Sequence, residues 1–477
     1  MATLNNKPLV VDLDGTLLRS DMLVESAFAY LRHKPFRAFE PLSWLLGGKA
    51  NLKARLADEV DVDVASLPYD QEVISFLEQQ KAAGRTLVLA TASHKKYAEA
   101  IAAHLGLFDR VLATHGNTNL SARTKRNVLV NEYGEKGFDY LGNSRDDLKV
   151  WASAHTAHIA NPEFGVESAA NRLGNVEQVI RTPARPVRTW IKQLRLHQWA
   201  KNALVFVPLL ASHKVGELDL LATGLLAFLL FGLCASSVYL LNDLLDLEDD
   251  RQHVSKRQRP LASGSVPIKA ALLLFPVLLL AAFAGSAWLM PWKFTLALAA
   301  YYSLTLAYSF ILKRIMTIDV IALAMLYTVR IVAGTFAFDV SLTFWMLAFS
   351  MFLLLSLAMV KRYAELRESR SKGKTELTPG RGYYPGDLEM ISSLGAASGY
   401  LSVMVLALYI QDQNTLALYR YPEVIWLACP VLLYWITRTW MIAHRGWMHD
   451  DPVVFAIKDR NSLLAAAAFA AIFWFAT

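Results

Sequence analysis

The chain has 477 residues, of which 54% are hydrophobic and 19% charged, and its formal net charge is +7 at pH 7. Within residues 195–477, most of the Lys and Arg residues stand between apolar runs. This pattern indicates membrane orientation rather than nucleic-acid binding, which a positive net charge often reflects in a soluble protein. The two cysteines, Cys234 and Cys429, both lie in apolar runs, which excludes a disulfide framework or a cysteine metal site.

The composition divides the chain into three parts. Residues 1–165 mix charged and apolar residues and predict a soluble domain, whereas residues 195–477 consist mainly of apolar runs near membrane-spanning length. Residues 166–194 form a basic connector, suited to an interface with anionic lipid. The first residues lack an apolar core behind a basic start, so we expect no signal peptide there.

The first predicted strand, Leu9 to Val11, leads directly into Asp12-Leu13-Asp14-Gly15-Thr16. Two carboxylates and a Gly-Thr turn at the end of a strand suit phosphoryl transfer. One carboxylate can attack phosphorus while the other protonates the leaving oxygen.

Two further strands are predicted, over Thr86 to Ala90 and Asp139 to Leu141. The first ends at Thr91, whose hydroxyl could hold phosphoryl oxygens that Lys125 would neutralise. The second ends in Gly142-Asn143-Ser144-Arg145-Asp146-Asp147. Strands that alternate with helical patterns predict an α/β, Rossmann-like parallel sheet, with its ligand at the carboxyl ends of the strands.

These stretches, and DLDGT above all, resemble the haloacid dehalogenase superfamily of phosphatases. The resemblance implies that Asp12 is the nucleophile, Asp14 the acid/base, Thr91 the phosphate-binding hydroxyl and Lys125 the charge-stabilising lysine. It also implies a helical cap over about residues 19–84. The implied ligands for Mg²⁺ are Asp12, Asp14, Asn143 and Asp147. The family usually has Asp at the position of Asn143, and a neutral amide could lower the affinity for Mg²⁺. The alternative is a folded but inactive scaffold domain.

The rest of the chain predicts nine membrane spans, each near the ~20 residues that a bilayer needs. They lie at about 195–212, 219–242, 268–290, 293–311, 317–336, 342–360, 389–411, 423–440 and 461–476. The first contains Lys201 and Pro208 and could be partly interfacial.

The charges of the loops predict the topology. One set of loops contains Arg251, Lys256, Arg257 and Arg259; Lys313 and Arg314; the run from Lys361 to Arg381; and the run from Arg438 to Arg460. The opposite set holds little beyond Lys214, Lys293 and Arg420. By the positive-inside rule, the first set and the N-terminal domain are cytoplasmic, the C-terminus lies outside, and the protein belongs in a bacterial-type inner membrane.

An acidic cluster follows the second span. Asn242, Asp243, Asp246 and Asp250 come directly after an apolar run, and their spacing places the carboxylates on one face of a helix end. Three such acids indicate a Mg²⁺ site at the membrane mouth, able to hold a diphosphate. Lys256, Arg257 and Arg259 follow and could bind phosphate oxygens. The alternative is a charged helix end solvated at the surface.

Asn242-Asp243-x-x-Asp246-x-x-x-Asp250 resembles the first Asp-rich motif of the UbiA superfamily of intramembrane prenyltransferases, which are all-α bundles. In that family the motif binds Mg²⁺, which grips a diphosphate leaving group. Most aromatic prenyltransferases of the family carry a second Asp pair after the sixth span, where this chain has Lys361, Arg362 and Glu365. Cations in place of acids suggest a further phosphate on a substrate.

A few other polar residues lie in or near the predicted spans. Arg330 lies within the fifth span, where an Arg is costly and therefore indicates function, although snorkelling or an ion pair would also account for it. Lys313 could line the polar pocket or anchor the topology. The run His449-Asp450-Asp451 could contact metal or phosphate, but a hydrated loop explains it equally.

The segments RLHQWAKN, KRQRPLASG and KRYAEL resemble the decaprenyl-phosphate phosphoribosyltransferase branch of that superfamily. This implies transfer of phosphoribose from phosphoribosyl diphosphate, a soluble donor, to a polyprenyl phosphate taken from the bilayer. The fused phosphatase could then dephosphorylate the product. One alternative is an aromatic prenyltransferase that joins a prenyl diphosphate to a ring acceptor, as in quinone synthesis. Another is a membrane-anchored, non-enzymatic scaffold.

Overall fold

The computed structural model describes residues 7–34, 37, 39–116, 119–183, 186–253, 256–373, 375–378, 381–412, 419–448 and 451–477. The chain folds into two compact units. The first comprises Met1–Leu194 and Tyr239–Phe275, and the second comprises Arg195–Val238 and Pro276–Thr477. The acidic cluster and the basic residues after it therefore belong to the same unit as the N-terminal domain.

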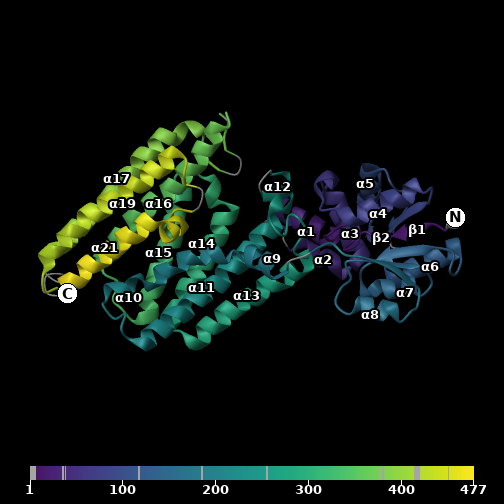
Figure 1. The fold of residues 1–477 in the computed structure, drawn as a ribbon, viewed down its shortest axis with the longest axis horizontal. Helices are drawn as coiled ribbons and strands as arrows, with labels where there is room; N and C mark the ends of the chain where they lie inside the picture. Colours follow the sequence, from purple (N-terminus) through teal and green to yellow (C-terminus); the bar gives the residue numbers. More distant parts are fainter. Residues whose placement is uncertain are drawn as a thin grey trace. The chain divides into compact units, whose positions relative to one another are not determined.

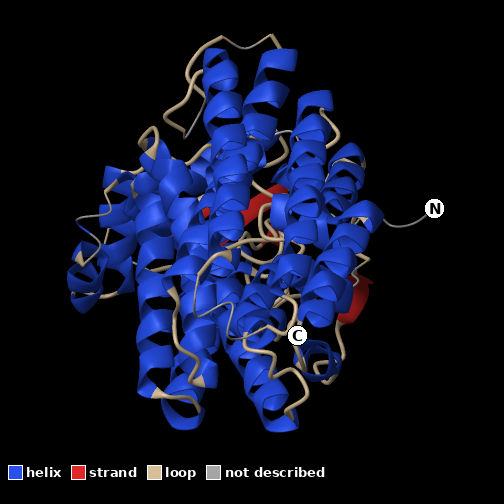
Figure 2. Ribbon diagram, turned by 90° about the vertical axis from the view of Figure 1, so that its left-hand side faces the viewer, coloured by secondary structure: helices blue, strands red, loops and turns tan. Residues whose placement is uncertain are grey.

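The first unit contains a six-stranded parallel sheet in the order β3-β2-β1-β4-β5-β6. All strands among the described residues belong to it, and helices make up the regular structure elsewhere (Figure 2). The strands are β1 (Leu9–Val11), β2 (Leu87–His94), β3 (Arg110–Thr114), β4 (Asp139–Gly142), β5 (Ala157–Ala160) and β6 (Val176–Ile180). The three strands expected from the sequence are confirmed as β1, β2 and β4, and they are neighbours.

Helices cover both faces of this sheet, which is why β1 is apolar at every position. Leu9 and Val11 pack into one core with α4 and α5, whereas Val10 packs into the other with α6, α7 and α8. These helices are α4 (Gln71–Ala82), α5 (Lys95–Leu105), α6 (Ala122–Tyr133), α7 (Leu148–Trp151) and α8 (Val166–Asn171). The sheet holds the end of β1 rigidly, at the point where the DLDGT stretch begins.

The expected helical cap has its own small core of Tyr30, Leu52, Leu56 and Val60. Its helices are α1 (Met22–His33), α2 (Glu40–Leu46) and α3 (Lys49–Glu59), followed by the 3-10 turn η2 (Val64–Ser66). Although the expected cap extended to about residue 84, Leu77 and the rest of the inner face of α4 pack under the sheet. The separate cap core thus ends before α4.

The second unit is helical, and α16, α17, α19 and α21 lie side by side (Figure 1). Its elements are η4 (Leu196–Phe206), α10 (Val207–Ala211), α14 (Trp292–Phe310), η6 (Leu312–Arg314), α15 (Ile318–Phe338), α16 (Phe344–Ser371), η7 (Pro385–Asp387), α17 (Leu388–Ile410), η8 (Pro422–Leu427), α19 (Ala428–Arg445), α20 (Pro452–Lys458) and α21 (Arg460–Ala476). Two long helices, α11 (Leu218–Leu245) and α13 (Ile268–Leu289), contribute to both units.

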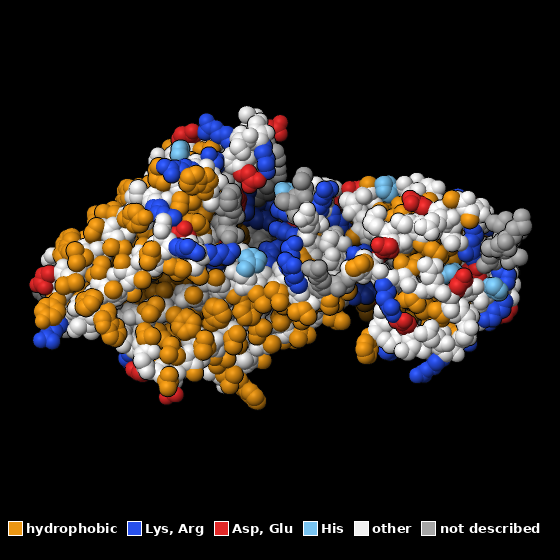
Figure 3. Space-filling view, viewed as in Figure 1, with side chains coloured by type: hydrophobic (Ala, Val, Ile, Leu, Met, Phe, Trp, Pro, Cys, Tyr) orange, Lys and Arg blue, Asp and Glu red, His pale blue; other side chains and the backbone are white. Residues whose placement is uncertain are grey.

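The helical bundle exposes apolar side chains on its surface, as a bilayer requires. Hydrophobic side chains cover its helices, whereas the surface of the α/β domain is mixed (Figure 3). Trp288 is 93% exposed and Trp474 is 80% exposed. Among the residues that the structure describes, six helices are long and apolar enough to cross a membrane: Leu218–Leu245, Ile268–Leu289, Ile318–Phe338, Phe344–Ser371, Pro385–Ile410 and Pro422–Arg445. The chain is therefore a multi-pass membrane protein.

Three of the nine expected spans differ from these six within the described residues. The segment 195–212 forms the 3-10 helix η4 and the short helix α10 rather than one α-helix. The segment 293–311 forms α14, which is less apolar than the six, and the segment 461–476 forms α21, which has only 17 residues. The structure thus supports six spans by length and hydropathy where the sequence predicted nine.

Candidate active sites

Asp12, directly after β1, belongs to a buried series of hydrogen-bonded polar side chains. The Nζ of Lys125 lies 2.6 Å from Asp12 Oδ1 and also donates to the Tyr140 hydroxyl at 3.0 Å. Tyr140 in turn donates to Asp147 Oδ1 at 2.7 Å. The structure therefore brings together Asp12, Lys125 and Asp147, as predicted. Tyr140 was missed, because it stands inside β4, where an aromatic residue is read as core.

The second carboxylate, Asp14, is fixed by the cap and by β2. Met22 donates its backbone N–H to Asp14 Oδ1 at 2.8 Å, and the Ser93 hydroxyl donates to Asp14 Oδ2 at 2.6 Å. The hydroxyl of Thr91 lies 3.5 Å from the same oxygen. Two hydroxyls of β2 thus face the acid, and the phosphate-binding role of Thr91 stays a prediction.

Burial is the main influence on the pKa of both carboxyls of this site. Burial raises the pKa of Asp12 to about 7, although the ammonium of Lys125 opposes the shift. Burial and the charge of Asp21 raise the pKa of Asp14. The pKa of both carboxyls is therefore raised, and Asp12 has in addition an ammonium group in direct contact, that of Lys125, which favours its ionised form.

The side chains around Asp12 offer few oxygen atoms that could bind Mg²⁺. Asp147 Oδ2 accepts from the backbone N–H groups of Asn143 and Ser144, so this carboxylate holds the loop together. Asn143 Oδ1 accepts from the Thr16 hydroxyl at 3.2 Å. Among the described residues, no three His, Cys, Asp or Glu side chains form a group that could hold a metal ion. Asp12 Oδ1 already contacts Lys125, and Asn143 offers a neutral amide oxygen, so these two residues supply one formal charge fewer than an Asp pair would.

Gly15 is required by the geometry of this loop. Its φ is +80°, which side chains rarely adopt, and a Cβ there would lie 2.4 Å from Asn143 Nδ2. Asn143 therefore packs directly against the backbone of the DLDGT turn.

The acidic cluster brings two of its three carboxylates together. One guanidinium nitrogen of Arg259 lies 3.3 Å from Asp243 Oδ1 and 2.6 Å from Asp250 Oδ2. Gln193, at the end of α9 (Pro186–Gln193), donates to Asp243 Oδ2 at 2.8 Å. Asp246 precedes α12 (Leu247–Gln252) and takes no part in this ion-pair group as far as the described residues go.

Asp243 and Asp250 are buried, and burial raises the pKa of Asp250, although Arg259 opposes the shift. Both carboxylates contact the same nitrogen atom of Arg259. They therefore point to one position and carry the negative charge that a bound cation needs. Arg259 supplies the positive charge in the structure, and a divalent ion would replace it. The next basic residues, Lys256 and Arg257, are exposed, with Lys256 Nζ 3.9 Å from Asp250. A solvated helix end would not bury two carboxylates on one arginine.

A buried ion pair follows the acidic cluster at once. Arg251 on α12 donates to both carboxylate oxygens of Glu25 on α1, at 3.0 and 2.6 Å, and both side chains are 5% exposed. Ser20 also donates to Glu25. Nearby, Lys269 lies 2.9 Å from Asp21, which caps α1. The segment after the acidic cluster is therefore fixed to the cap, a link that the sequence did not reveal.

In the second unit, Arg362 is buried in a network of acids. It donates to both oxygens of Asp319, at 2.7 and 2.9 Å, and also contacts Glu365. Arg381 contacts Glu365 at 3.5 Å. Arg362 and Glu365, two predicted substrate-binding residues, thus engage each other, and Lys313 lies in the short turn η6.

Lys361, the neighbour of Arg362, belongs to a different group. Lys361 and Lys201 lie 3.1 and 2.7 Å from the same oxygen of Asp451, and Tyr327 donates to that carboxylate. Burial would raise the pKa of Asp451, but the two ammonium groups outweigh it and hold the pKa below its usual range. His449 and Asp450 lie outside the described residues. The sequence predicted only that Lys201 lies in a partly interfacial first span, and its ion pair with Asp451 was not predicted.

Arg330 is buried beside this group. Its Nε donates to Asn202 Oδ1 at 2.9 Å, and another nitrogen donates to the Tyr301 hydroxyl at 3.0 Å. Its guanidinium also stacks over the Tyr301 ring, 4.5 Å from the centroid. Arg330 therefore points into the bundle and does not snorkel.

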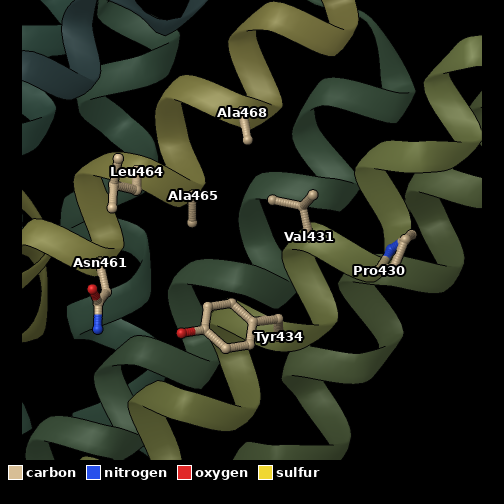
Figure 4. Close-up of a pocket in the computed structure, with 7 residues that line it drawn as sticks. All are labelled: Pro430, Val431, Tyr434, Asn461, Leu464, Ala465 and Ala468. Atoms are coloured by element: carbon tan, nitrogen blue, oxygen red, sulfur yellow. The ribbon is translucent and has the colours of Figure 1, made fainter.

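A shallow groove of about 390 Å³ lies between α19 and α21 (Figure 4). It is lined by Pro430, Val431, Tyr434, Asn461, Leu464, Ala465 and Ala468. None of these seven side chains is charged, so the groove lacks the groups that a phosphorylated substrate needs.

Comparison with known proteins identifies both parts of the chain. Residues 203–458 match the UbiA prenyltransferase family, and residues 9–149 match haloacid dehalogenase-like hydrolases. An uncharacterised protein, y4nM of Sinorhizobium fredii, is 36% identical over 98% of this chain and 90% of its own length. Nodulation protein NoeC of Azorhizobium caulinodans is 35% identical over 58% of this chain and 90% of its own.

Decaprenyl-phosphate phosphoribosyltransferase of Mycobacterium tuberculosis is 30% identical over 61% of this chain and 95% of its own length. Among solved structures, a UbiA homolog from Archaeoglobus fulgidus bound to DMAPP and Mg²⁺ is 17% identical, with a TM-score of 0.44 over 60% of this chain and 98% of its own. The chain belongs to the UbiA prenyltransferase family and carries a haloacid dehalogenase-like hydrolase domain at its N-terminus.

Proposed function

We propose that the membrane domain transfers phosphoribose from phosphoribosyl diphosphate to a polyprenyl phosphate, with diphosphate as the leaving group. The observation that carries this proposal is the convergence of two buried carboxylates, Asp243 and Asp250, on one cation, followed by the basic residues Lys256 and Arg257. Mg²⁺, when bound there, would neutralise the charge that develops on the departing diphosphate. The named phosphoribosyltransferase relatives support this donor and acceptor.

The residues of the chain have distinct parts in this reaction. Asn242, Asp243, Asp246 and Asp250 would hold the diphosphate end through the metal, and Arg259 would exchange its carboxylate partners for phosphate oxygens. The anomeric carbon gains cationic character as diphosphate departs, and a phosphate oxygen of the lipid attacks it. Lys361 and Arg330 would bind phosphate, whereas Arg362, Glu365 and Lys313 would shape the basic region around them.

We propose further that the N-terminal domain removes the 5-phosphate of the lipid-linked product. An oxygen of Asp12 attacks phosphorus, and the bond between phosphorus and the sugar oxygen breaks. Asp14 donates its proton to that oxygen, and water then hydrolyses the aspartyl phosphate with Asp14 as base. Lys125 and Thr91 hold the phosphoryl oxygens, and the raised pKa of Asp14 supports its role as acid.

We also propose nine membrane crossings and a cytoplasmic position for the N-terminal domain, in a bacterial-type inner membrane. The segment 195–211 supports the first crossing, because eleven residues at the 3-10 rise and five at the α-helical rise extend about 30 Å, the thickness of the hydrocarbon core. The 19-residue α14 would extend about 28 Å and the 17-residue α21 about 25 Å.

The test uses the full-length protein in lipid nanodiscs with Mg²⁺. Phosphoribosyl diphosphate and a polyprenyl phosphate should yield lipid-linked phosphoribose and free diphosphate, and the Asp12→Asn variant should accumulate the 5-phosphorylated lipid. Formation of a prenylated ring from a prenyl diphosphate and hydroxybenzoate, without any reaction of phosphoribosyl diphosphate, would overturn the proposal in favour of an aromatic prenyltransferase.

A further inference from the structure

Two lysines share a single acid in the interior of the second unit, and Arg330 lies close enough to interact with one of them. Lys201 and Lys361 share Asp451, and the charges of Arg330 and Lys201 interact. Asn202 directly follows Lys201 in the chain, and its side chain contacts Arg330. The side chains of Lys201, Asp451 and Arg330 are 10%, 4% and 3% exposed. Three cations against one carboxylate leave a buried excess of positive charge, which an anion would balance.

The amide of Asn202 points to a ligand. Its oxygen accepts from Arg330, but its nitrogen, in a residue only 1% exposed, has no hydrogen-bond partner among the described residues. A buried donor without a partner is rare, because it loses its bond to water and gains none in return. The nitrogen of Asn202 and the three neighbouring cations could all donate hydrogen bonds to one anion that carries several oxygen atoms.

Other acids are not available to these cations. Glu365 lies within electrostatic reach of Lys361, but it is bonded to Arg362 and paired with Arg381. Asp319 is bonded to Arg362. Lys361 is 27% exposed, the most open side chain of the group, and therefore marks the side from which a ligand would enter.

We propose that Lys201, Asn202, Arg330 and Lys361 form a binding site for a phosphate monoester, with Asp451 holding the two lysines in position. This inference rests on the proposed function, because both substrates offer such a group: the head group of the polyprenyl phosphate and the 5-phosphate of the donor. Each carries terminal oxygens that can accept from the lysines, from the remaining N–H groups of Arg330 and from Asn202 Nδ2.

The test measures binding without turnover, on the full-length protein in nanodiscs. Farnesyl phosphate represents the lipid source, ribose 5-phosphate represents the donor source, and farnesol is the neutral control. Asn202→Asp replaces the unpartnered donor with an acceptor and should weaken the affinity for one phosphate probe at least tenfold, without changing the affinity for farnesol. The probe that is affected identifies the source of the phosphate.

Asn461→Asp is the matched control, because Asn461 also lies against an arginine, Arg438, but outside this site. It should leave binding of both probes unchanged. Lys201→Gln provides a second variant if Asn202→Asp does not fold, and it should weaken the same probe. Unchanged affinity for both phosphates in both variants, or an equal loss for farnesol, would overturn the phosphate site while leaving the proposed transferase intact. If the protein binds the phosphate probe but shows no transferase activity, the phosphate-binding site stands and the proposed transferase function is wrong.

Discussion

At the scale of single residues, Asn143 is the position where the proposed phosphatase site differs from the usual aspartate of the family. Its amide oxygen accepts from Thr16, where an aspartate would place a charged oxygen. We predict that Asn143→Asp lowers the Mg²⁺ concentration for half-maximal phosphatase activity by about tenfold, because a carboxylate binds Mg²⁺ more strongly than an amide. Asn171→Asp, an exposed position at the end of α8, should leave the Mg²⁺ requirement unchanged. An equal requirement in both variants would contradict the role of Asn143.

Asp12 carries a second prediction at this scale. Asp12→Asn keeps the shape of the side chain but removes the attacking carboxylate, so release of phosphate should fall by about a thousandfold or more. The assay measures inorganic phosphate released from a lipid-linked sugar phosphate. Transferase activity of the same preparation serves as the internal control and should persist. Phosphate release at the original rate would mean that another residue is the nucleophile.

These local motifs are the part of the site that the sequence predicts well. Asp12 and Asp14 are fixed by the strand before them, and Thr91 by the next strand, so position in the sequence determines position in space. Asn202 and Asp451 escape such reasoning, because each gains its partner from a distant segment of the chain. Tyr140 escapes it for another reason, because an aromatic residue within a strand is read as part of the core.

At the scale of elements, the bond between α1 and α12 determines how the segment after the acidic cluster is held. Arg251 and Glu25 form a buried bidentate pair, and removal of one partner leaves the other charged and unpaired. We predict that Arg251→Met lowers the free energy of unfolding of the first unit by about 3–5 kcal/mol. Thermal unfolding followed by circular dichroism would measure this loss.

The double variant Glu25→Met with Arg251→Met tests whether the loss comes from the unpaired charge. It should recover most of the stability, because two apolar side chains of similar length leave no buried charge behind. Lys95→Met, which breaks an exposed pair with Glu99, should not change the melting temperature. Equal losses in the single and double variants would show that packing, not charge, matters at this position.

Periodicity and hydropathy predict the long helices better than the short segments. The apolar runs of α11, α13 and α16 give clear spans, but η4 and α10 divide a run of similar composition. Pro208 has no backbone N–H to continue a helix through its position, and the buried Lys201 takes its partner from another segment. Neither effect is visible in a hydropathy average.

At the scale of the whole molecule, the loop charges predict which segments face the cytoplasm. In a background with Cys234→Ala and Cys429→Ala, a membrane-impermeant maleimide should label Lys214→Cys in intact cells and label Lys313→Cys only after permeabilisation. Cys234 and Cys429 are buried, so their replacement by Ala removes little accessible thiol. Labelling in the reverse order would contradict the proposed orientation.

The division into units could not be predicted from composition. Residues 239–275 lie among apolar runs and read as part of the membrane domain, yet they pack within the same unit as the sheet and cap. The pairs Arg251–Glu25 and Lys269–Asp21 account for this, and both join residues that are far apart in the sequence. Hydropathy finds the membrane segments, but only such long-range pairs decide which unit a connecting segment joins.

The turn at Gly15 separates two kinds of evolutionary constraint. The proposed hydrolysis depends on Asp12 and Asp14, whereas the positive φ and the contact with Asn143 would strain the loop with any other residue at Gly15. A lineage that abandoned hydrolysis while retaining the domain would lose the two acids and still retain the glycine. Which of these three residues has been replaced in a related protein would therefore distinguish an active hydrolase domain from one that retains only the fold.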